Sequence, residues 1–443
     1  MTEMKDSGFA FIGQIPENWT ILRIKHAAWL KGRIGWDGLK AEEFTDKGPY
    51  LITGTDFDNG AVNWETCVHI SDERFEEDQL LHIKEGDLLI TKDGTVGKVA
   101  IVKGCPEKVS LNSGIMIIRN YTKYKYLDKY MYYTLMSNVF TDWFNYNTKP
   151  GTTILHLYQH DFDNFKFLLP PLEEQQQIVS YLDVRCSKID GAIAQRKAII
   201  EKLKDYKSAV ITKAVTKGLN PNVEMKDSGI EWIGFIPINA IVEKLKFIVD
   251  ITDGTHETPK YVAPSNCTYP LVTSKCIVKG KVDIMLAKHI NEKDYNEINK
   301  RSKVNKYDII MPMIGTIGNP AFIDKEIVFA IKNVALFKCK NNKILGKYIW
   351  YLLNSNLATS QFGYVNSGGV QKFITQDKIK NLKFVMHHNY KQIVDYLDYK
   401  CTKIDEAIAR QEQAVAKLEE YRKSVIYYAV TGKIDCRDKE SIA

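Results

Sequence analysis

Two copies of one sequence pattern fill this chain, and the duplication constrains its fold more than any other feature. The segment 4–8 (MKDSG) returns unchanged at 225–229, and the segment 177–183 (QIVSYLD) returns as 392–398 (QIVDYLD). Residues between these segments stay aligned with only a few loop deletions. A repeat of this length indicates a duplicated domain pair and not a solenoid, so we expect two similar halves related by approximate two-fold symmetry.

Each half divides into an α+β domain followed by a long helix. Short β-branched runs, such as 87–91 and 115–118, alternate with glycine-rich turns around one helical stretch at 126–144, which indicates an irregular sheet. We therefore expect four parts: a first globular domain at 1–170, a first long helix with a linker at 171–224, a second globular domain at 225–386, and a second long helix with a tail at 387–443.

The two helical segments carry the same apolar stripe. Apolar residues recur at steps of three, four and seven along 178–214 and again along 393–429, and neither segment contains an internal proline. At 1.5 Å per residue, roughly 40 residues make a rod of about 60 Å, too long to be buried on one small domain. We predict that the helices pack as an antiparallel coiled coil; two separate amphipathic helices, each on its own domain, are the alternative. The residues expected to pack between the helices are Ile178, Leu182, Ile189, Ile193, Leu203, Ile393, Leu397, Ile404, Ile408 and Leu418.

Length and composition exclude several classes of protein. A chain of 443 residues is too long for one ordinary core, so two to four domains are expected. No apolar stretch approaches twenty residues and the first residues are polar, so we expect a cytoplasmic protein without a membrane span or signal peptide. The eight cysteines form no C-x-x-C pair, which predicts buried free thiols and neither a zinc site nor disulfides. The net charge of +7 permits binding to a polyanion.

Catalytic motifs are missing from the sequence. A DNA adenine methyltransferase needs an Asn/Asp-Pro-Pro-aromatic motif, but 220–222 and 319–321 both lack the second proline. A common nuclease motif begins with Pro-Asp, and that pair does not occur; H-E-x-x-H and G-x-S-x-G are also absent. The adjacent His387 and His388 point apart and lack a third ligand, so no metal site is expected. We expect a protein that is not an enzyme.

Glycine-rich turns and matched polar pairs are candidate ligand contacts. The turns 92–98 and 313–319 follow predicted strands, and their glycines let backbone amides approach a phosphate, although the P-loop spacing is missing. Asn112-Ser113 and Lys332-Asn333 occupy matched positions before strands, where Asn can read adenine and Lys can read guanine or bind a phosphate. A plain hairpin turn explains each segment equally well.

Further polar segments extend this set. Residues 149–153 and 366–372 precede a short predicted helix, and Thr255-His256 lies next to Lys260-Tyr261. Connecting loops and helix caps are the alternative interpretations. Because a protein with two similar halves suits a ligand with two related halves, duplex DNA is the leading candidate ligand.

Several motifs, taken in order, resemble those of the specificity subunits of type I restriction–modification systems. Residues 251–261 (ITDGTHETPKY), followed by 270–275 (PLVTSK), are similar to the opening of many target recognition domains in that family. So is the Gly-Asp strand that leads to a Gly-Thr-x-Gly turn at 86–97, and 170–175 (PPLEEQ) resembles the entry into the family's first conserved helix. The resemblance covers essentially the whole chain.

This resemblance implies a non-catalytic reader of double-stranded DNA. Each target recognition domain would read one half of a split target, and the helices would fix the gap between the halves. Two methyltransferase subunits would dock along the long helices, and two restriction subunits can join them. The chain itself would hold no cofactor, while S-adenosylmethionine would bind the methyltransferase subunits. The alternative is a coiled-coil scaffold with two protein-binding domains.

The halves depart from each other where DNA contact is expected. The second half lacks PPLEEQ, has Met313 where the first has Lys92, and has the 253–256 turn where the first has 31–36 (KGRIGW). We therefore expect an asymmetric target. The expected DNA contacts are Lys31, Arg33, Trp36, Thr53, Lys92, Thr95, Lys98, Asn112, Ser113, Lys149, Thr152, Thr153, Thr255, His256, Lys260, Tyr261, Thr273, Ser274, Lys275, Thr316, Lys332, Asn333, Ser367, Gln371 and Lys372.

Overall fold

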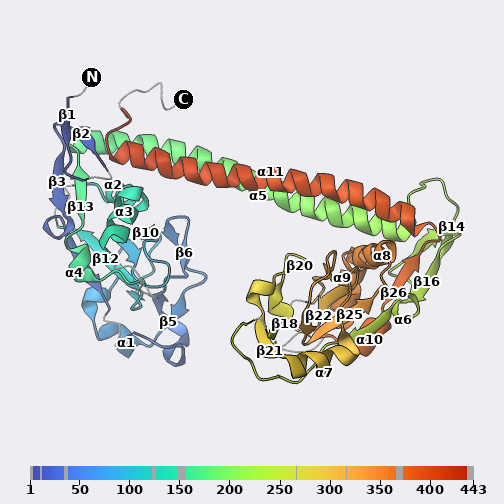
Figure 1. Ribbon diagram of the computed structural model, residues 1–443. Helices are drawn as coiled ribbons and strands as arrows, with labels where there is room; N and C mark the ends of the chain where they lie inside the picture. Colours follow the sequence, from blue (N-terminus) through green and yellow to red (C-terminus); the bar gives the residue numbers. More distant parts are fainter. Residues whose placement is uncertain are drawn as a thin grey trace. The chain divides into compact units, whose positions relative to one another are not determined.

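The chain forms two compact units in a computed structural model (Figure 1). Unit 1 combines residues 1–196 with 413–443, and unit 2 is the continuous stretch 197–412. Each unit holds one α+β domain and a part of both long helices. The structure describes residues 3–9, 12–33, 38–121, 126–147, 155–265, 267–315, 317–365 and 373–436.

The domain of unit 1 is built on a four-stranded antiparallel sheet in the order β10-β9-β12-β4. Its strands β9 and β12 are continuous apolar runs whose residues 88–90 and 115–118 are almost fully buried, because structure covers both faces of the sheet. A three-stranded sheet, β11-β5-β8, packs beside it. The strands are β1 (Met4–Asp6), β2 (Gln14–Pro16), β3 (Thr20–Arg23), β4 (Ala28–Gly32), β5 (Thr45–Ile52), β6 (Phe57–Asp58), β7 (Ala61–Val62), β8 (Val68–His69), β9 (Leu88–Thr91), β10 (Val99–Ile101), β11 (Val109–Leu111), β12 (Ile115–Asn120) and β13 (Lys166–Leu169).

The helices of this domain differ in one respect from the prediction. The expected single helix at 126–144 is two helices, α2 (Asp128–Met136) and α3 (Asn138–Asn147). Ser137 separates them in an extended conformation, and its hydroxyl accepts a hydrogen bond from the backbone N–H of Val139 at 3.2 Å. A serine favours a helix cap over a helix interior, which explains the break. Two short helices complete the domain, α1 (Asp72–Glu76) and α4 (Gln159–Phe162).

Unit 2 repeats this domain strand for strand. Its four-stranded sheet, β23-β22-β25-β17, and its three-stranded sheet, β24-β18-β21, have the same order and the same strand directions as those of unit 1. The strands are β14 (Met225–Asp227), β15 (Phe235–Pro237), β16 (Ile241–Lys244), β17 (Asp250–Asp253), β18 (Thr268–Val272), β19 (Ile277–Val278), β20 (Lys281–Val282), β21 (Lys288–Asn291), β22 (Ile309–Pro312), β23 (Ala321–Phe322), β24 (Ala330–Ile331), β25 (Val334–Lys338) and β26 (Lys383–Met386). The helices are α6 (Leu245–Ile248), α7 (Glu292–Ser302), α8 (Lys343–Leu353), α9 (Asn356–Val365) and α10 (Gln376–Lys380).

The two long helices are α5 (Leu172–Lys217) and α11 (Tyr390–Val430). Left-handed glycines follow both ends: α5 ends directly before Gly218, with φ 71°, and α11 ends two residues before Gly432, with φ 70°. Only glycine adopts this conformation without strain, and it allows the backbone to close the last helical turn. The glycines therefore explain why the chain leaves each long helix within a residue or two of its end.

Within each unit the helices run antiparallel. In unit 1, Arg422 near the end of α11 pairs with Asp190 of α5 at 2.8 Å. In unit 2, Lys207 near the end of α5 pairs with Asp405 of α11 at 2.7 Å. The antiparallel pairing of the two helices was correctly predicted.

The expected helix-packing residues are all at least half-buried. Of these, Ile189 and Ile193 form a cluster with Val415 and Leu418 in unit 1. Others belong to the domain cores, so the apolar stripe packs both on the other long helix and on a globular domain. The buried residues are Ile178, Leu182, Ile189, Ile193, Ile393, Leu397 and Ile404, and the half-buried ones are Leu203, Ile408 and Leu418.

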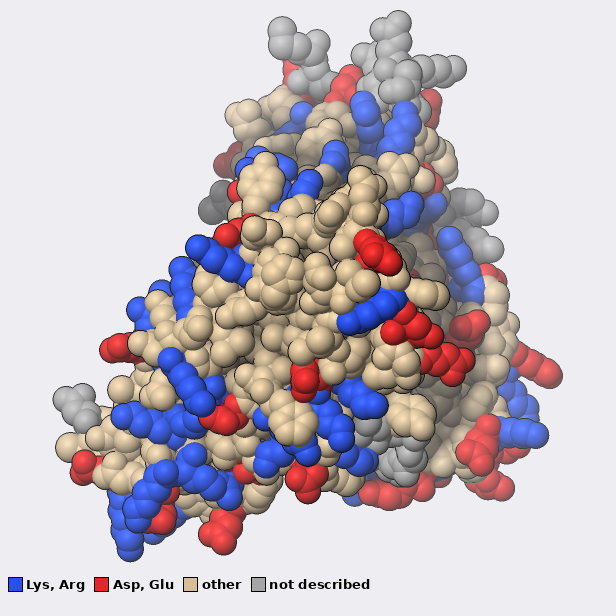
Figure 2. Space-filling model, turned by 90° about the vertical axis from the view of Figure 1, so that its right-hand side faces the viewer, with Lys and Arg blue, Asp and Glu red and all other residues tan. Residues whose placement is uncertain are grey.

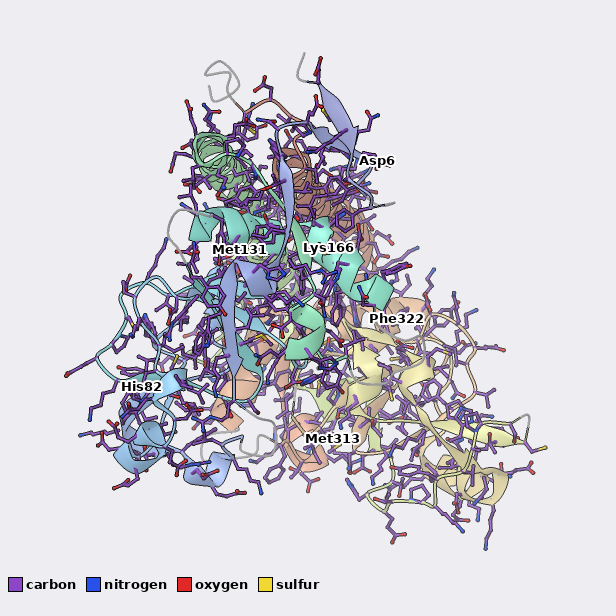
Figure 3. All side chains as sticks on the ribbon, turned by 90° about the vertical axis from the view of Figure 1, so that its left-hand side faces the viewer. Asp6, His82, Met131, Lys166, Met313 and Phe322 are labelled. Carbon is purple, nitrogen blue, oxygen red and sulfur yellow. The ribbon has the colours of Figure 1, made fainter. Side chains whose placement is uncertain are left out.

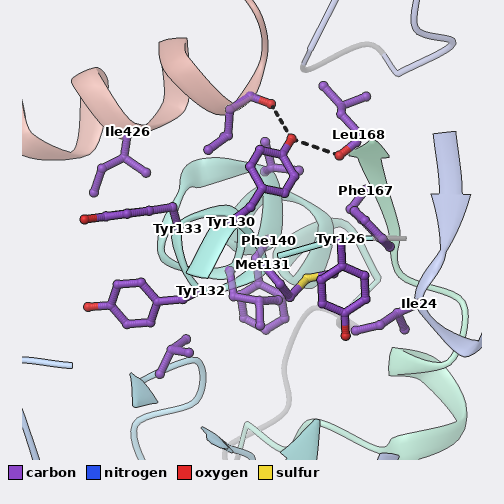
Figure 4. Close-up of a cluster of buried hydrophobic side chains, with 14 of the residues drawn as sticks. Ile24, Tyr126, Tyr130, Met131, Tyr132, Tyr133, Phe140, Phe167, Leu168 and Ile426 are labelled. Carbon is purple, nitrogen blue, oxygen red and sulfur yellow. Dashed lines mark hydrogen bonds between the residues drawn. The ribbon is translucent and has the colours of Figure 1, made fainter. Parts of the chain in front are cut away.

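The core of unit 1 joins the domain to both helices (Figure 4). Tyr130 of α2 is fully buried, and its hydroxyl donates to the carbonyl oxygen of Leu168 at 2.9 Å and lies 3.4 Å from that of Val430, near the end of α11. In unit 2 the matched Tyr348 donates to the carbonyl of Val385 at 2.9 Å. Burial raises the pKa of both phenols above the ordinary value, so they stay protonated donors.

A joint of three polar residues also connects each domain to its helix. In unit 1, Asp183 of α5 accepts from Lys129 at 2.6 Å and from the Tyr133 hydroxyl at 2.7 Å. In unit 2, Asp398 of α11 accepts from Lys347 and from Tyr351, the latter at 2.8 Å. The duplication thus preserves the domain–helix contact as well as the fold.

Three further observations bear on function. No helix among the described residues has the length and apolar character to cross a membrane. All eight cysteines are free thiols. The described residues include no group of three or more His, Cys, Asp or Glu side chains that could bind a metal ion.

Candidate nucleic-acid interface

In unit 2 the predicted contact residues meet at one end of the four-stranded sheet. Thr255 follows β17, while Lys332 and Asn333 lie between β24 and β25. The backbone N–H of Asn333 donates to the carbonyl of Thr255 at 3.1 Å, and that of Gly254 donates to Val334 at 3.0 Å. A Cβ at position 254 would lie 2.2 Å from the Ile331 carbonyl oxygen, so only glycine allows these segments to meet.

His256 is held at this end by two neighbours. Its Nε2 lies 2.9 Å from Asp253 Oδ2 and its Nδ1 lies 2.9 Å from Asn333 Oδ1. The other oxygen of Asp253 accepts from Arg301 of α7 at 2.8 Å. Asp253 itself is buried, whereas the side chains of His256 and Arg301 are each 61% exposed. A buried carboxylate therefore orients two exposed polar side chains.

Lys332 and the segment after His256 extend this polar surface. The Lys332 ammonium group donates to the hydroxyl of Thr258. Lys260 and Tyr261 are exposed, and the ammonium group of Lys288 lies 4.5 Å above the Tyr261 ring. The cations Lys332, Lys260 and Lys288 and the Tyr261 ring supply the kinds of donor and stacking surface that nucleic acids use.

In unit 1 two of the predicted contacts lie in the interior. The Arg33 side chain is buried, and its Nε donates to the carbonyl of Leu111 at 3.2 Å. Lys92 is buried as well and donates to the carbonyl of Arg33 at 2.9 Å. Burial lowers the pKa of the Lys92 ammonium group, against an opposing effect of Asp93. These cations hold strand ends together in this conformation.

Asn112 has a similar internal role. Its amide oxygen accepts from the backbone N–H of Leu39 at 3.0 Å, and its amide nitrogen donates to the carbonyl of Leu39 at 3.1 Å. Both polar atoms that would read an adenine are thus engaged with the protein. The neighbouring Ser113 is half-buried at the same sheet end.

The remaining predicted residues of unit 1 lie nearer the surface. Thr95 and Lys98 are exposed in the turn between β9 and β10. Lys31 is half-buried and forms an ion pair with Asp78 at 3.3 Å. Thr53 donates to Asp56 at 2.8 Å and stabilises a turn after β5.

Matched turns appear again in unit 2. The hydroxyl of Thr273 lies 3.7 Å from the thiol of Cys276, in the turn that corresponds to Thr53. Ser274 is half-buried and Lys275 is exposed. The other predicted contacts fall outside the described residues: Trp36, Lys149, Thr152, Thr153, Thr316, Ser367, Gln371 and Lys372.

The structure adds residues that the sequence did not single out. In unit 2, Asp253 and Arg301 complete the His256 network. In unit 1, Asp93 pairs with His156, which is 63 residues away in the sequence. Asp253 is the first residue of the 253–256 turn, so the sequence could have placed it among the expected contacts. Arg301 lies at the end of α7 and carries no sequence signal, because only the fold brings it to Asp253.

Charge on the surface is mixed. Figure 2 shows Lys and Arg side chains interspersed with acidic ones over one face, with larger uncharged areas between them. This agrees with the modest net charge of +7. Local groups of cations, and not an overall basic surface, must therefore select any anionic partner.

Comparison with known proteins gives consistent matches over nearly the whole chain. The family model described as "Type I restriction modification DNA specificity domain" matches residues 16–204 and 243–416. The specificity subunit of the type I restriction enzyme MjaVIII from Methanocaldococcus jannaschii is 27% identical over 435 residues, which cover 95% of this chain and 94% of that protein. The putative MjaX specificity subunit of the same organism is 24% identical and is covered to 95%.

A solved structure shares the fold. It comes from work on complex assembly and conformational transition of the type I restriction–modification system. The match has a TM-score of 0.63 with 14% sequence identity, and it covers 95% of this chain and 99% of that chain.

Proposed function

The chain belongs to the type I restriction–modification DNA specificity family, and we propose that it reads a two-part, asymmetric DNA target with one domain of each unit. The family membership makes it a DNA sequence-specificity subunit and favours this function over that of a coiled-coil scaffold. The observation that carries the proposal is the matched sheet end: the two units share one fold, yet different polar side chains occupy that end in each.

Unit 2 offers the better defined reading surface. His256, Lys332 and Asn333 lie together with exposed or half-exposed side chains, and Arg301 adds a second cation. Lys and Arg can donate to guanine or to phosphate, and Asn can pair with adenine. Asp253 fixes the group, so its members approach DNA already oriented.

In unit 1 we assign different roles to the predicted residues. Arg33, Lys92 and Asn112 support the sheet end through contacts with backbone carbonyls and amides. Thr95 and Lys98 are exposed in the adjoining turn and are the stronger candidates for DNA contact. This division would explain why the two domains read different bases.

The chemistry would lie on partner subunits in the cytoplasm. The sequence lacks the motifs of an adenine methyltransferase or a nuclease, so we infer a subunit without catalytic activity of its own. Two methyltransferase subunits would dock along α5 and α11 and would hold S-adenosylmethionine, and two restriction subunits would complete the restriction complex. The related solved structure concerns assembly of such a system.

Methylation mapping tests this function. The chain is expressed with its cognate methyltransferase subunit in a host free of DNA methylation, and modified bases are located by single-molecule sequencing. We expect a two-part motif that is methylated only when this chain is present. Methylation that is the same with and without this chain, while both proteins are soluble and co-purify, would contradict the proposal.

A single substitution sharpens the test. Lys332→Ala should lower the free-energy discrimination between the correct base and other bases by about 1–3 kcal/mol in the half of the motif that unit 2 reads. Discrimination in the other half should not change. Lys300→Ala, which removes an exposed lysine of the same unit that pairs with Glu297, is the matched control and should leave both halves unchanged. Equal relaxation of both halves would contradict the assignment of Lys332 to one reader.

A further inference from the structure

A lysine-rich cleft of about 870 Å³ opens in unit 2 between the domain and α11. The β19–β20 hairpin and the segment after β23 form one side, and α11 forms the other from Asp398 to Asp405. Its lining includes Phe322 and Trp350, so an apolar surface accompanies the charges.

Four lysines of this cleft are available to a ligand. Lys281, Lys306, Lys325 and Lys343 are exposed or half-exposed, and none of them forms an ion pair with another described residue. Lys306 lies 5.1 Å above the ring of its neighbour Tyr307. Together they create a local cation-rich pocket on a chain with a modest overall charge.

The acidic residues of the cleft are mostly engaged. Asp398 accepts from Lys347 and Tyr351, and Asp405 pairs with Lys207 at 2.7 Å. Asp324 is the remaining carboxylate in the lining. Cations therefore outnumber available anions, which favours a ligand with several negative charges.

The matched region of unit 1 differs in charge at two of these four positions. Ala61 and Glu85 occupy the positions of Lys281 and Lys306 in the repeat. The cavity there is about 270 Å³ and includes Tyr132, whose hydroxyl would lie 2.1 Å from a Cβ at Gly60. The two units therefore differ at this cleft in the charges at the positions of Lys281 and Lys306 and in the size of the cavity.

The cleft also lies away from the candidate reading surface. Phe322 of β23 pairs with Ile309 at the start of β22, whereas Met313 lies beyond the end of that strand (Figure 3). The backbone N–H of Met313 donates to the carbonyl of Asn333, which places the His256 group at that same end. A DNA duplex is too wide to enter a cleft of this size, while acidic side chains of a polypeptide can enter it. The cleft borders α11, the helix along which partner subunits are proposed to dock.

From these observations we propose that the cleft binds an acidic segment of one methyltransferase subunit, so that the two copies of that subunit are held differently. The inference rests on the proposed function, because it assumes that partner. Glutamate and aspartate side chains would pair with the four lysines, and an apolar side chain would pack on Phe322 and Trp350. The copy bound by unit 1 would lack the ion pairs to Lys281 and Lys306, where that unit has Ala61 and Glu85.

The test measures the two successive dissociation constants of the cognate methyltransferase subunit for the full chain at low and high salt. The variant carries Lys281→Gln, Lys306→Gln, Lys325→Gln and Lys343→Gln, and the matched control carries Arg at the same four positions. We expect the glutamine variant to weaken one of the two constants on the order of tenfold or more at low salt and to reduce its salt dependence. The other constant and the arginine control should match the wild type.

Three results would overturn the inference. Two unchanged constants would show that the cleft holds no part of this partner. If both dissociation constants of the methyltransferase subunit are unchanged but the glutamine variant binds DNA with a reduced salt dependence, the cleft binds DNA phosphates instead. A wild-type chain that binds no methyltransferase subunit would overturn the proposed function itself, together with the inference.

Discussion

The carboxylates Asp183 and Asp398 have the same structural role in the two units: each connects its domain to a long helix. Each lies on a long helix and accepts from one lysine and one tyrosine of a domain helix, α2 in unit 1 and α8 in unit 2. Burial, followed by the neighbouring aspartate, raises the pKa of Tyr133 and of Tyr351, so both phenols remain donors. The duplicated contact indicates that domain and helix must keep one relative orientation within each unit.

Removing this carboxylate charge should destabilise its unit. Asp398→Asn weakens two hydrogen bonds, one to a cation and one to a phenol, and should lower the free energy of unfolding by about 1–3 kcal/mol. Chemical denaturation followed by fluorescence measures the change. Asp205→Asn, at an exposed position of α5, is the control and should stay within about 0.5 kcal/mol of the wild type.

A histidine in unit 2 should make stability depend on pH. His387 is buried, and its Nε2 lies 3.1 Å from the carbonyl oxygen of Val215. Desolvation lowers its pKa below the ordinary value of 6.5, the hydrogen bond to Val215 opposes this shift, and the charge of His388 adds to it. The unfolded state therefore binds the proton more readily than the folded state, so this contribution to stability is lost as pH falls below about 6.5.

The measurement compares the wild type with His387→Gln between pH 7.5 and pH 5.5. The wild type should lose stability more steeply as pH falls, by at most about 1.4 kcal/mol per pH unit from one proton. Glutamine can still donate to the Val215 carbonyl but does not titrate. Identical pH slopes for the two proteins would contradict this role of His387.

At the scale of the element, the long helices combine two packing surfaces. The first part of α5 packs on the domain of unit 1 and on the last turns of α11, where Val425 and Ile426 are buried. Its last turns pack in the same way in unit 2, together with the first turns of α11. The stripe is therefore buried by a helix and by a domain together.

This burial predicts unequal effects of two similar substitutions. Ile393→Ala, at a fully buried position of α11, should cost about 2–5 kcal/mol because it leaves a cavity in the core of unit 2. Ile199→Ala removes a side chain that is 41% exposed on α5 and should cost less than about 0.5 kcal/mol. Equal losses in urea unfolding would show that the two faces of the helices are packed alike.

The elements were predictable where local sequence determines them. Helical periodicity and duplication predicted both long helices and their pairing, because each apolar position has a partner at a fixed spacing. The break at Ser137 was missed because one apolar stretch spans both helices. The roles of Arg33 and Asn112 could not be predicted, since their partners Leu111 and Leu39 reach them only through the fold.

At the scale of the whole molecule, the shared fold makes the two readers interchangeable. The strand orders agree, and the residues of the domain–helix joint recur in both units. We expect a chain in which 225–386 replaces 4–169 to fold. The second copy of the domain would bring Lys347 and Tyr351, which can form with Asp183 the contacts that they form with Asp398.

Such a chain should read the same bases in both halves of its target. Methylation mapping beside the wild-type chain and the same methyltransferase subunit would reveal the motif. A motif that keeps two different halves would contradict the assignment of one half to each domain. The wild-type chain, mapped in parallel, controls for the activity of the partner.

The division of the chain also sets an order of events on the ribosome. Unit 2 is continuous, whereas the core of unit 1 needs Val425, Ile426, Ala429 and Val430 from the end of α11. The domain made first is therefore completed last, after a delay of roughly 13 to 52 s at about 5–20 residues per second. During that interval the apolar residues around Tyr130 lack their packing partners from α11, so we expect this domain to be the part of the nascent chain that a chaperone acting during translation would bind.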